Sequence, residues 1–217
     1  MKKRGMMTAL SESEIDLVDE VLSTARSVRR KLDFERPVPR ELLLEAIDVA
    51  VQAPTGIGGE NWRFLIVDAP EQKAAISEIY TGILVELMKA RGESMKPTHQ
   101  ALTERMHEIP AMIFVCVDGL PMADTVASHV GYYGSILPAA WSLMLALRAR
   151  GLGTTWTTLL SARQDDVKAV LGMPEGTLQT VMLPVAFTKG AVLRRAQRMS
   201  AKEVAFQNYW AQEIMPK

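Results

Sequence analysis

Apolar residues recur every three or four positions in the first part of the chain, which is the pattern of amphipathic helices. A first helix is expected to begin at a capping pair, Ser13 and Asp16, and to end near Ala25. A second helix is expected to follow two prolines and to stop at Pro54 and Gly56. Its apolar face consists of Leu43, Ile47, Ala50 and Val51, and that of the first helix consists of Ile15, Leu17, Val18, Val21 and Leu22.

Continuous apolar runs that are rich in β-branched residues predict buried strands at residues 62–67, 113–117 and 178–187. The first two strands are expected to lie in the centre of a sheet. Between them, residues 75–108 have a mixed helical pattern that is interrupted by Gly92 and by a proline. We call residues 75–108 the lid segment, because this pattern favours a pair of mobile helices.

A long helix is predicted from Asp124 to Arg150, and Pro138 is expected to kink it. Because it is apolar on most faces, this helix is expected to be central in the fold or to lie at a subunit interface. It is followed by a threonine-rich stretch at residues 154–158 and by a short helix at residues 165–171.

A chain of 217 residues can bury the core of one domain without needing a second. The order of helices and strands does not alternate as it does in a doubly wound sheet. The last residues, 190–217, combine three arginines with Phe206, Tyr209 and Trp210. This composition favours an extended arm that packs on another subunit.

The chain has 25 basic and 25 acidic residues, so it has no strong field that would attract polyanions. Nucleic acids and anionic membranes are therefore not expected as partners. No run of residues approaches the roughly 20 uninterrupted apolar positions that cross a bilayer. A single cysteine excludes an internal disulfide. Without a convincing signal peptide, we expect a cytoplasmic location.

Several common kinds of catalytic site are not indicated by the sequence. The histidines, His99, His107 and His129, lack the spacing of metal ligands, so no metal site is expected. There is no GxGxxG motif after a strand, no P-loop and no GxSxG motif. Cys116 lies inside a hydrophobic strand, where a buried inert thiol is expected rather than a nucleophile.

Two groups of arginines remain as candidates for binding an anion. Arg26 and Arg29 flank Ser27 after the first helix, and Arg194 and Arg195 lie near the other end of the chain. Guanidinium groups match phosphate oxygens through paired hydrogen bonds. From their spacing alone, solvated surface charges are the favoured interpretation.

Several motifs in order resemble the FMN-dependent nitroreductase family over residues 25–195. In the first half these motifs are Thr24-Ala25-Arg26-Ser27-Val28-Arg29-Arg30-Lys31-Leu32-Asp33, Pro37-Val38-Pro39, Ala53-Pro54-Thr55-Gly56 and Trp62-Arg63-Phe64. In the second half they are Pro138-Ala139-Ala140, the run from Leu145 to Thr155, Leu171-Gly172-Met173-Pro174 and Arg194-Arg195. The order and spacing of these motifs are more specific than any one of them.

The resemblance implies an α+β fold, with a mixed central β-sheet flanked by helices, in an intertwined homodimer. It implies one FMN-binding domain over residues 1–217, with FMN bound non-covalently at the subunit interface. In this arrangement residues 190–217 form a C-terminal arm that packs on the partner subunit.

The resemblance also implies which residues contact the cofactor. The phosphate and the polar edge of the ring are assigned to the first arginine motif, and one turn and one loop are assigned to the isoalloxazine. The implied contacts are Arg26, Ser27, Val28 and Arg29 in the motif, Pro54, Thr55 and Gly56 in the turn, Thr155, Trp156 and Thr157 in the loop, and Arg194 and Arg195 in a C-terminal phosphate clamp. Thr157 is the hydroxyl expected near the flavin N5 atom. The chain departs from the family at Ala25, where many members have arginine, and at Gly58, where asparagine is usual.

The implied activity is reduction of nitroaromatics, quinones or related small electrophiles by NADH or NADPH, through a ping-pong mechanism. No catalytic residue is expected, because the flavin carries the redox chemistry. One alternative is a reductive dehalogenase or an ene-type reductase on the same fold. A second alternative is a protein that stores or senses FMN with little turnover. A third alternative is a dimer without flavin that binds a different phosphate-containing small molecule through its arginines.

Overall fold

The structure is a computed structural model that describes residues 9–56 and 59–214. The chain divides into two compact units, of which the larger comprises Ala25–Val192. The smaller comprises Met1–Thr24 together with Leu193–Lys217. The helices of the larger unit are α2 (Arg40–Ala50), α3 (Pro70–Arg91), α4 (Pro97–Thr103), α5 (Val126–Ala149) and α6 (Gln164–Leu171), with short 3-10 helices η1 (Met106–Glu108) and η2 (Leu159–Arg163).

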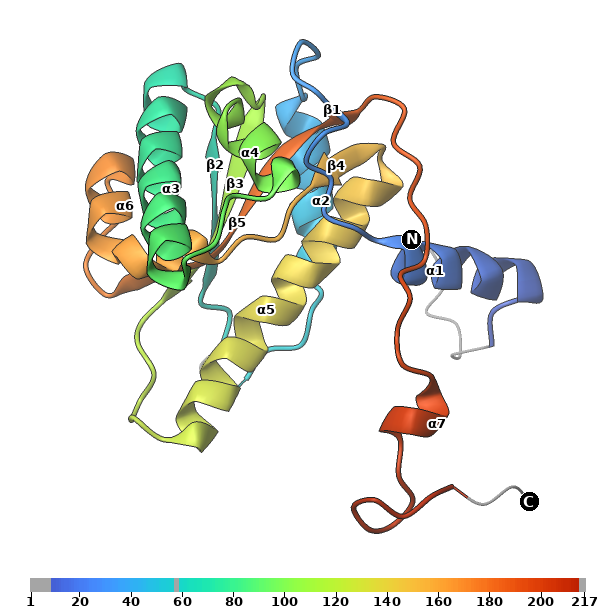
Figure 1. Ribbon diagram of the computed structural model, residues 1–217. Helices are drawn as coiled ribbons and strands as arrows, with labels where there is room; N and C mark the ends of the chain where they lie inside the picture. Colours follow the sequence, from blue (N-terminus) through green and yellow to red (C-terminus); the bar gives the residue numbers. More distant parts are fainter. Residues whose placement is uncertain (1–8, 57–58, 215–217) are drawn as a thin grey trace, which may run out of the picture. The chain divides into compact units, whose positions relative to one another are not determined.

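A five-stranded sheet forms the centre of the larger unit (Figure 1). Its strands are β1 (Leu32–Asp33), β2 (Trp62–Val67), β3 (Ala111–Asp118), β4 (Leu152–Thr154) and β5 (Thr177–Thr188). They follow the order β1-β5-β3-β2, and β4 also pairs with β5. The predicted α+β class is confirmed, and the three predicted strands are found at β2, β3 and β5.

Two details of the predicted sheet are wrong for the described residues. Each strand pair is antiparallel, so the sheet of one chain is not mixed. The connection between β2 and β3 gives the reason. The chain leaves the end of β2, passes through α3, α4 and η1, and enters β3 at the same end of the sheet, so the two strands run in opposite directions. Lys73 Nζ at the start of α3 donates to Ile109 O just before β3, at 2.8 Å. The second detail concerns β2, which lies at an edge of the sheet rather than in its centre.

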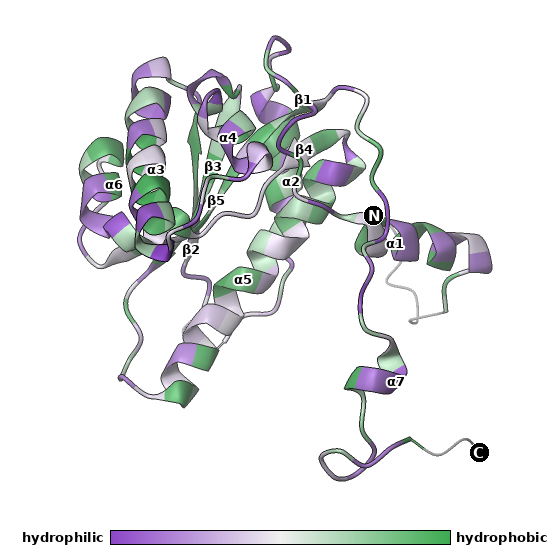
Figure 2. Cartoon of the chain, viewed as in Figure 1, coloured by the Kyte–Doolittle hydropathy of each residue, from purple (hydrophilic) through white to green (hydrophobic). Residues whose placement is uncertain are grey.

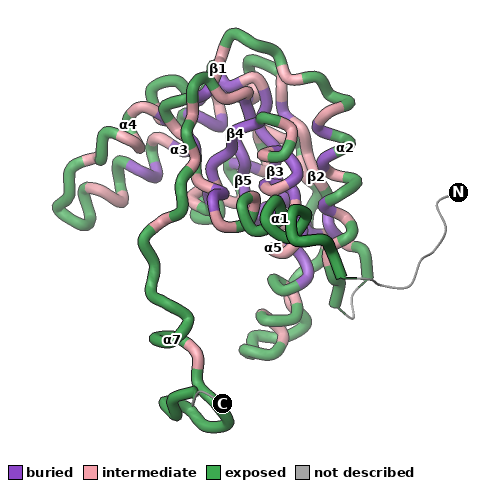
Figure 3. Tube along the Cα trace, turned by 90° about the vertical axis from the view of Figure 1, so that its right-hand side faces the viewer, coloured by how far each residue is buried: buried purple, intermediate pink, exposed green. Residues whose placement is uncertain are grey.

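Helices cover the sheet on both faces, and each face has its own hydrophobic core. Along β3 successive side chains alternate between the two cores, as they do in any extended strand. Ile113, Val115 and Val117 join the core under α2 and α5, which we call the first core. Met112, Phe114 and Cys116 join the second core, under α3 and α6. Figure 2 shows that β3 and β5 are mostly hydrophobic, and Figure 3 shows that they are mostly buried.

Helix α5 is predominantly apolar, as its sequence predicts, and Pro138 lies inside it. It is the one helix in the described part of the chain that is long and apolar enough to cross a membrane by length and composition. Of the window that passes this test, 44% is buried inside the protein. A core helix of a globular protein passes the same test, so this finding is weak evidence for a membrane span.

The lid segment contains the predicted pair of helices. Helix α3 ends at Gly92, whose φ of 63° lies in the left-handed region that glycine adopts without strain. Helix α4 then begins at Pro97, a favourable residue for a first turn. The mobility of this segment stays a prediction.

The smaller unit contains α1 (Glu12–Thr24) and α7 (Ala201–Val204). The predicted capping pair of α1, Ser13 and Asp16, is wrong by two residues. Ser11 caps the helix, because its backbone nitrogen and its hydroxyl both donate to the Glu14 carboxylate, at 2.8 and 2.6 Å. Most of α1 and α7 is exposed (Figure 3). Whether this unit packs on a partner subunit stays a prediction.

Candidate functional site

Two segments that are distant in sequence pair at the end of the sheet. Val28 N donates to Thr154 O at 2.8 Å, and Thr155 Oγ1 donates to Val28 O at 2.9 Å. The second bond is buried and joins residues 127 positions apart. The structure therefore brings the predicted arginine motif against the predicted threonine loop.

The close approach of these segments depends on Gly153. A β-carbon at this position would lie 2.8 Å from both Leu32 Cδ2 and Thr188 Cγ2, and 3.2 Å from Val28 Cβ. Since ordinary carbon–carbon contacts are about 3.5–4.0 Å, a larger residue does not fit here without movement. Glycine thus allows residue 28 to pack directly on β4.

The side chains of the threonine loop point in different directions. Thr155 is buried and holds the Val28 carbonyl, while Trp156 packs against the first core. Thr157 forms an isolated bridge with Met182 of β5 through two backbone hydrogen bonds of 3.3 and 2.9 Å. Thr157 also interacts with the lid segment, where its hydroxyl acts to lower the pKa of Tyr80.

Arg29 lies close to two ionisable side chains of the lid segment. Burial raises the pKa of Tyr80, while its hydrogen bond to Thr157 and the positive charge of Arg29 act to lower it. Burial also lowers the pKa of His99, and the charges of Arg29 and Lys96 lower it further. His99 Nδ1 is buried without a hydrogen-bond partner in the described part of the chain. The charge of Arg29 therefore acts on ionisable groups of two helices of the lid segment, α3 and α4.

Arg26 and Ser27 lie beside this cluster. Arg26 is half-buried, and its Nη1 atom donates to Ala25 O at 2.6 Å. Ser27 is exposed. The motif thus presents a hydroxyl and guanidinium groups next to one another, which is a donor set suited to a phosphate.

The predicted turn at Pro54, Thr55 and Gly56 is exposed and lies elsewhere in the larger unit. Gly56 N donates to Ser135 Oγ of α5 at 2.8 Å, and Ser135 Oγ donates to Gly131 O at 2.8 Å. A cavity of about 280 Å³ lies at this turn. It is lined mainly by apolar atoms of Leu120, Pro121, Met122, Ala127, Gly131 and Tyr132, with Gly56, Asn61, Ser128 and Ser135.

Different elements hold the turn and the loop. Ser135 holds the turn 14 residues before Ala149, the last residue of α5, which corresponds to about 21 Å along the helix. Strand β4 with Thr154 begins only after that end. The turn is thus held by α5, while the loop runs back along β5 to Met182.

Arg194 and Arg195 belong to the smaller unit. Both are exposed, and Arg195 Nε donates to Ser23 Oγ at 3.0 Å. Their predicted role as a phosphate clamp stays a prediction.

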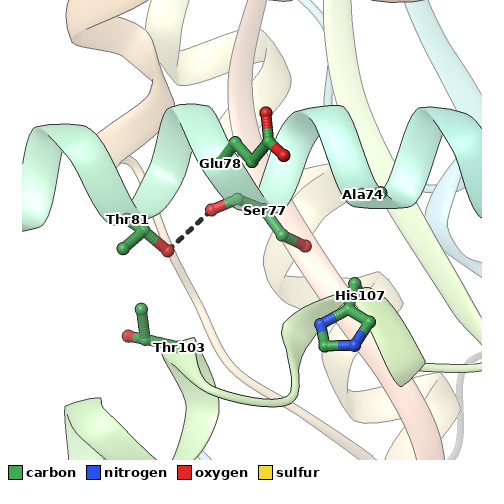
Figure 4. Close-up of a pocket in the computed structure, with 6 residues that line it drawn as sticks. All are labelled: Ala74, Ser77, Glu78, Thr81, Thr103 and His107. Atoms are coloured by element: carbon green, nitrogen blue, oxygen red, sulfur yellow. Dashed lines mark hydrogen bonds between the residues drawn. The ribbon is translucent and has the colours of Figure 1, made fainter.

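Other potential sites are less developed. Cys116 is buried, and burial together with the charge of Asp118 raises the pKa of its thiol to about 12. No group of three His, Cys, Asp or Glu side chains that could hold a metal occurs among the described residues. A cleft of about 470 Å³ lies between α3 and the α4–η1 region (Figure 4). Its threonine hydroxyls, on Thr81 and Thr103, donate to carbonyl oxygens one turn earlier in their own helices.

Tyr80, His99 and Ser135 were not predicted as site residues. Tyr80 lies on the buried face of a helix, where an aromatic residue indicates core packing. Ser135 left a usable signal, because it is a polar residue on the buried side of an otherwise apolar helix.

The fold and the paired arginine and threonine segments define a protein of the nitroreductase fold. A solved structure of oxidised iodotyrosine deiodinase bound to FMN and 3-iodo-L-tyrosine has a TM-score of 0.63 and 22% identity with it. That match covers 83% of this chain and 95% of the other. The model of the nitroreductase family matches residues 22–187, and the chain belongs to this family.

Relatives within the family differ in chemistry. Iodotyrosine deiodinase 1 of Rattus norvegicus is 29% identical over 194 residues, which is 85% of this chain and 67% of that protein. The 5,6-dimethylbenzimidazole synthase of Rhodospirillum rubrum is 26% identical over 166 residues, which is 73% of this chain and 76% of that protein. The family is therefore established, while these names leave the reaction open.

Proposed function

We propose that this protein is an FMN-dependent oxidoreductase that uses NAD(P)H to reduce a small electrophile such as a nitroaromatic or a quinone. The observation that carries the proposal is the pairing of residues 26–29 with residues 154–157 through two short hydrogen bonds. Family membership and the FMN named for a structure of the same fold support the choice of cofactor.

The residues at this pairing fit a flavin mononucleotide. Arg26 and Ser27 offer donors for the phosphate, and Arg29 offers a positive charge. When bound, FMN supplies the hydride and electron chemistry that protein side chains lack. Arg29 would hold its positive charge at the polar edge of the ring, where it would stabilise negative charge.

The same reasoning supports a homodimer. The turn at Pro54–Gly56 is held by α5 and the loop at Thr155–Thr157 by β5, and we propose that a second copy supplies one of them to a shared ring. Helix α5 also carries an exposed apolar stripe that includes Val126, Val130 and Trp141, which are 82%, 66% and 40% exposed. Light scattering is expected to give twice the 24.0 kDa chain mass, and a monomer would contradict this part of the proposal.

The visible absorption spectrum of the purified protein, recorded before and after anaerobic addition of NADH or NADPH, tests the cofactor and the reductant. Flavin bands that bleach are expected. Bands that persist would favour storage or sensing of FMN, and a colourless protein that FMN does not reconstitute would refute the proposal.

A matched pair of variants tests the site itself. Arg29→Ala removes the charge that faces the lid segment and is expected to weaken FMN binding by about 10- to 100-fold, the effect of losing a charged hydrogen bond. Arg30→Ala removes the same kind of charge from the exposed neighbour and is expected to leave affinity unchanged. Equal effects of the two variants would contradict the assigned site.

Reductive dehalogenation is the second candidate, favoured by the similarity to the rat deiodinase. Turnover of 3-iodotyrosine and of a nitroaromatic by the reduced protein separates the two reactions. Faster turnover of the nitroaromatic supports the main proposal, and iodide release as the faster reaction replaces it with the second candidate.

A further inference from the structure

The cavity at the turn is held open by hydrogen bonds from a single helix. Its walls come from the turn at Gly56, from residues 120–122 after β3 and from the first half of α5. Ser135 of α5 accepts from the backbone of the turn at 2.8 Å. Tyr132 of α5 donates its hydroxyl to Gly119 O at 2.7 Å, next to residues 120–122. Helix α5 thus fixes the two walls that face it.

Small residues on α5 leave room inside this cavity. Gly131 lines it one helical turn before Ser135, and a β-carbon at Gly131 would have no atom within 4 Å. Ala127 lines it one further turn away. Apolar cavities of roughly 150 Å³ bind benzene. A cavity of about 280 Å³ therefore has room for a ring with one or two substituents.

The polar side chains of the cavity are mostly paired within the protein. The hydroxyl hydrogens of Tyr132 and Ser135 are both donated to backbone carbonyls, at 2.7 and 2.8 Å. Asn61 Nδ2 also donates to a backbone carbonyl, at 3.0 Å. Ser128 Oγ accepts a backbone N–H at 3.1 Å, and its own hydrogen has no acceptor among the described residues. The cavity thus suits an apolar ligand that carries one or two acceptor oxygens.

The cavity also has no charge to offer a ligand. Among the described residues, none of the side chains that line it is charged. Burial raises the pKa of Tyr132 to about 12, so this phenol stays neutral. The acidic residues that flank the loop after β3 are engaged elsewhere, Asp118 by Arg63 at 2.9 Å and Asp124 by His129 at 3.0 Å. A charged ligand would lose its water here without gaining an ionic partner, which is strongly unfavourable.

We propose that this cavity binds the ring of an uncharged aromatic electrophile and excludes the zwitterion of a free amino acid, an inference that rests on the proposed function. Gly56, for which the resemblance implies a flavin contact, lines the cavity, so a ring held here lies at the cofactor turn. Free 3-iodotyrosine carries an ammonium and a carboxylate, and the cavity has no partner for either. Its side chains thus favour the main proposal over reductive dehalogenation of that amino acid.

Two probes that share a nitrophenyl ring test this selectivity. They are 4-nitrotoluene, which is uncharged, and 4-nitrophenylalanine, which adds the charged groups of an amino acid. Calorimetric titration of the FMN-bound protein is expected to show that 4-nitrotoluene binds at least about tenfold more tightly, because the charged groups would be buried without partners. Equal affinities, or tighter binding of 4-nitrophenylalanine, would overturn the inference.

A matched pair of glycine variants locates the binding site. Gly131→Leu places a side chain in the cavity and is expected to weaken binding of 4-nitrotoluene at least about tenfold, because the ring and the leucine cannot share one space. Gly134→Leu is the control. Gly134 is an exposed glycine of α5 that does not line the cavity, and a β-carbon there also meets no atom within 4 Å. This variant is expected to bind 4-nitrotoluene as the wild type does.

A second variant keeps the test decisive if Gly131→Leu does not fold. Ala127→Leu fills the same cavity from the preceding helical turn and is expected to weaken binding in the same way. Circular dichroism shows which variants are folded. Wild-type affinity in a folded cavity variant would overturn the inference.

Failure of the proposed function gives a different result. If the protein takes up no FMN, or if NADH and NADPH do not bleach it, the same titrations of the purified protein still measure the cavity. Selective binding of 4-nitrotoluene that is lost in Gly131→Leu then supports the cavity without the reductase. Reduction of 4-nitrotoluene by Gly131→Leu with wild-type kinetics supports the reductase and refutes the role of the cavity.

Discussion

Replacing Gly153 by alanine tests the contact between the two segments of the candidate site. The new β-carbon would lie 2.8 Å from Leu32 Cδ2 and from Thr188 Cγ2. Ordinary carbon contacts are about 3.5–4.0 Å, so these neighbours or β4 must move. Overpacking of this kind costs about 1–3 kcal/mol. For a chain of this size, that cost lowers the melting temperature by about 2–12 °C.

The same displacement is expected to weaken FMN binding, because the new β-carbon lies 3.2 Å from Val28 Cβ. Val28 is flanked in sequence by Ser27 and Arg29 of the arginine motif, so a shift of Val28 moves both residues. Circular dichroism during heating measures the stability without FMN, and quenching of FMN fluorescence measures the affinity. Gly82→Ala is the control. It adds a methyl group to an exposed position of α3, where nothing lies within 4 Å. That change is expected to stabilise the helix by about 0.5–1 kcal/mol. A Gly153→Ala protein that melts at or above the wild-type temperature would refute the packing argument.

Three further changes have defined outcomes. Ser135→Ala removes the acceptor of Gly56 N and is expected to lower the free energy of unfolding by about 0.5–1.5 kcal/mol, measured in urea; an unchanged midpoint would show that the turn is held otherwise. Cys116 is buried and the pKa of its thiol is raised to about 12, so a thiol reagent at pH 8 is expected to react only after unfolding; rapid labelling of the native protein would contradict this. Burial lowers the pKa of His99, so the unfolded state binds more protons below about pH 6.5 and wild-type stability falls as the pH decreases. His99→Gln is expected to lose less stability than the wild type between about pH 6.5 and 5 in urea titrations, and parallel pH profiles would show that His99 is not responsible.

Local patterns in the sequence predicted most of the elements. The run of apolar residues that predicted a strand at residues 62–67 coincides with β2, since a continuous apolar run is stable only where both faces are covered. Glycines with positive φ marked the ends of helices, as Gly172 does after α6. The cap of α1 was misplaced, because several serines precede this helix and only the geometry shows that Ser11 pairs with Glu14.

The place of each strand within the sheet was harder to predict. β2 and β3 are both composed mostly of apolar residues, yet β2 lies at the edge of the sheet and β3 lies in its centre. Helices cover both faces of the sheet even at its edge, so an edge strand keeps apolar residues. The hydrophobic pattern indicates which side chains are buried, but it does not indicate which strands pair with one another.

The sequence by itself determined the helices, most strands and the family, because these depend on local periodicity and on motifs in a fixed order. Only the tertiary structure decided that Val28 pairs with Thr154, that Thr157 interacts with Tyr80, and that Gly56 is held by Ser135 near the middle of α5. Each of these contacts joins residues more than 70 positions apart. Such contacts arise from the packing of whole elements against the sheet, and no local pattern of polar and apolar residues specifies them.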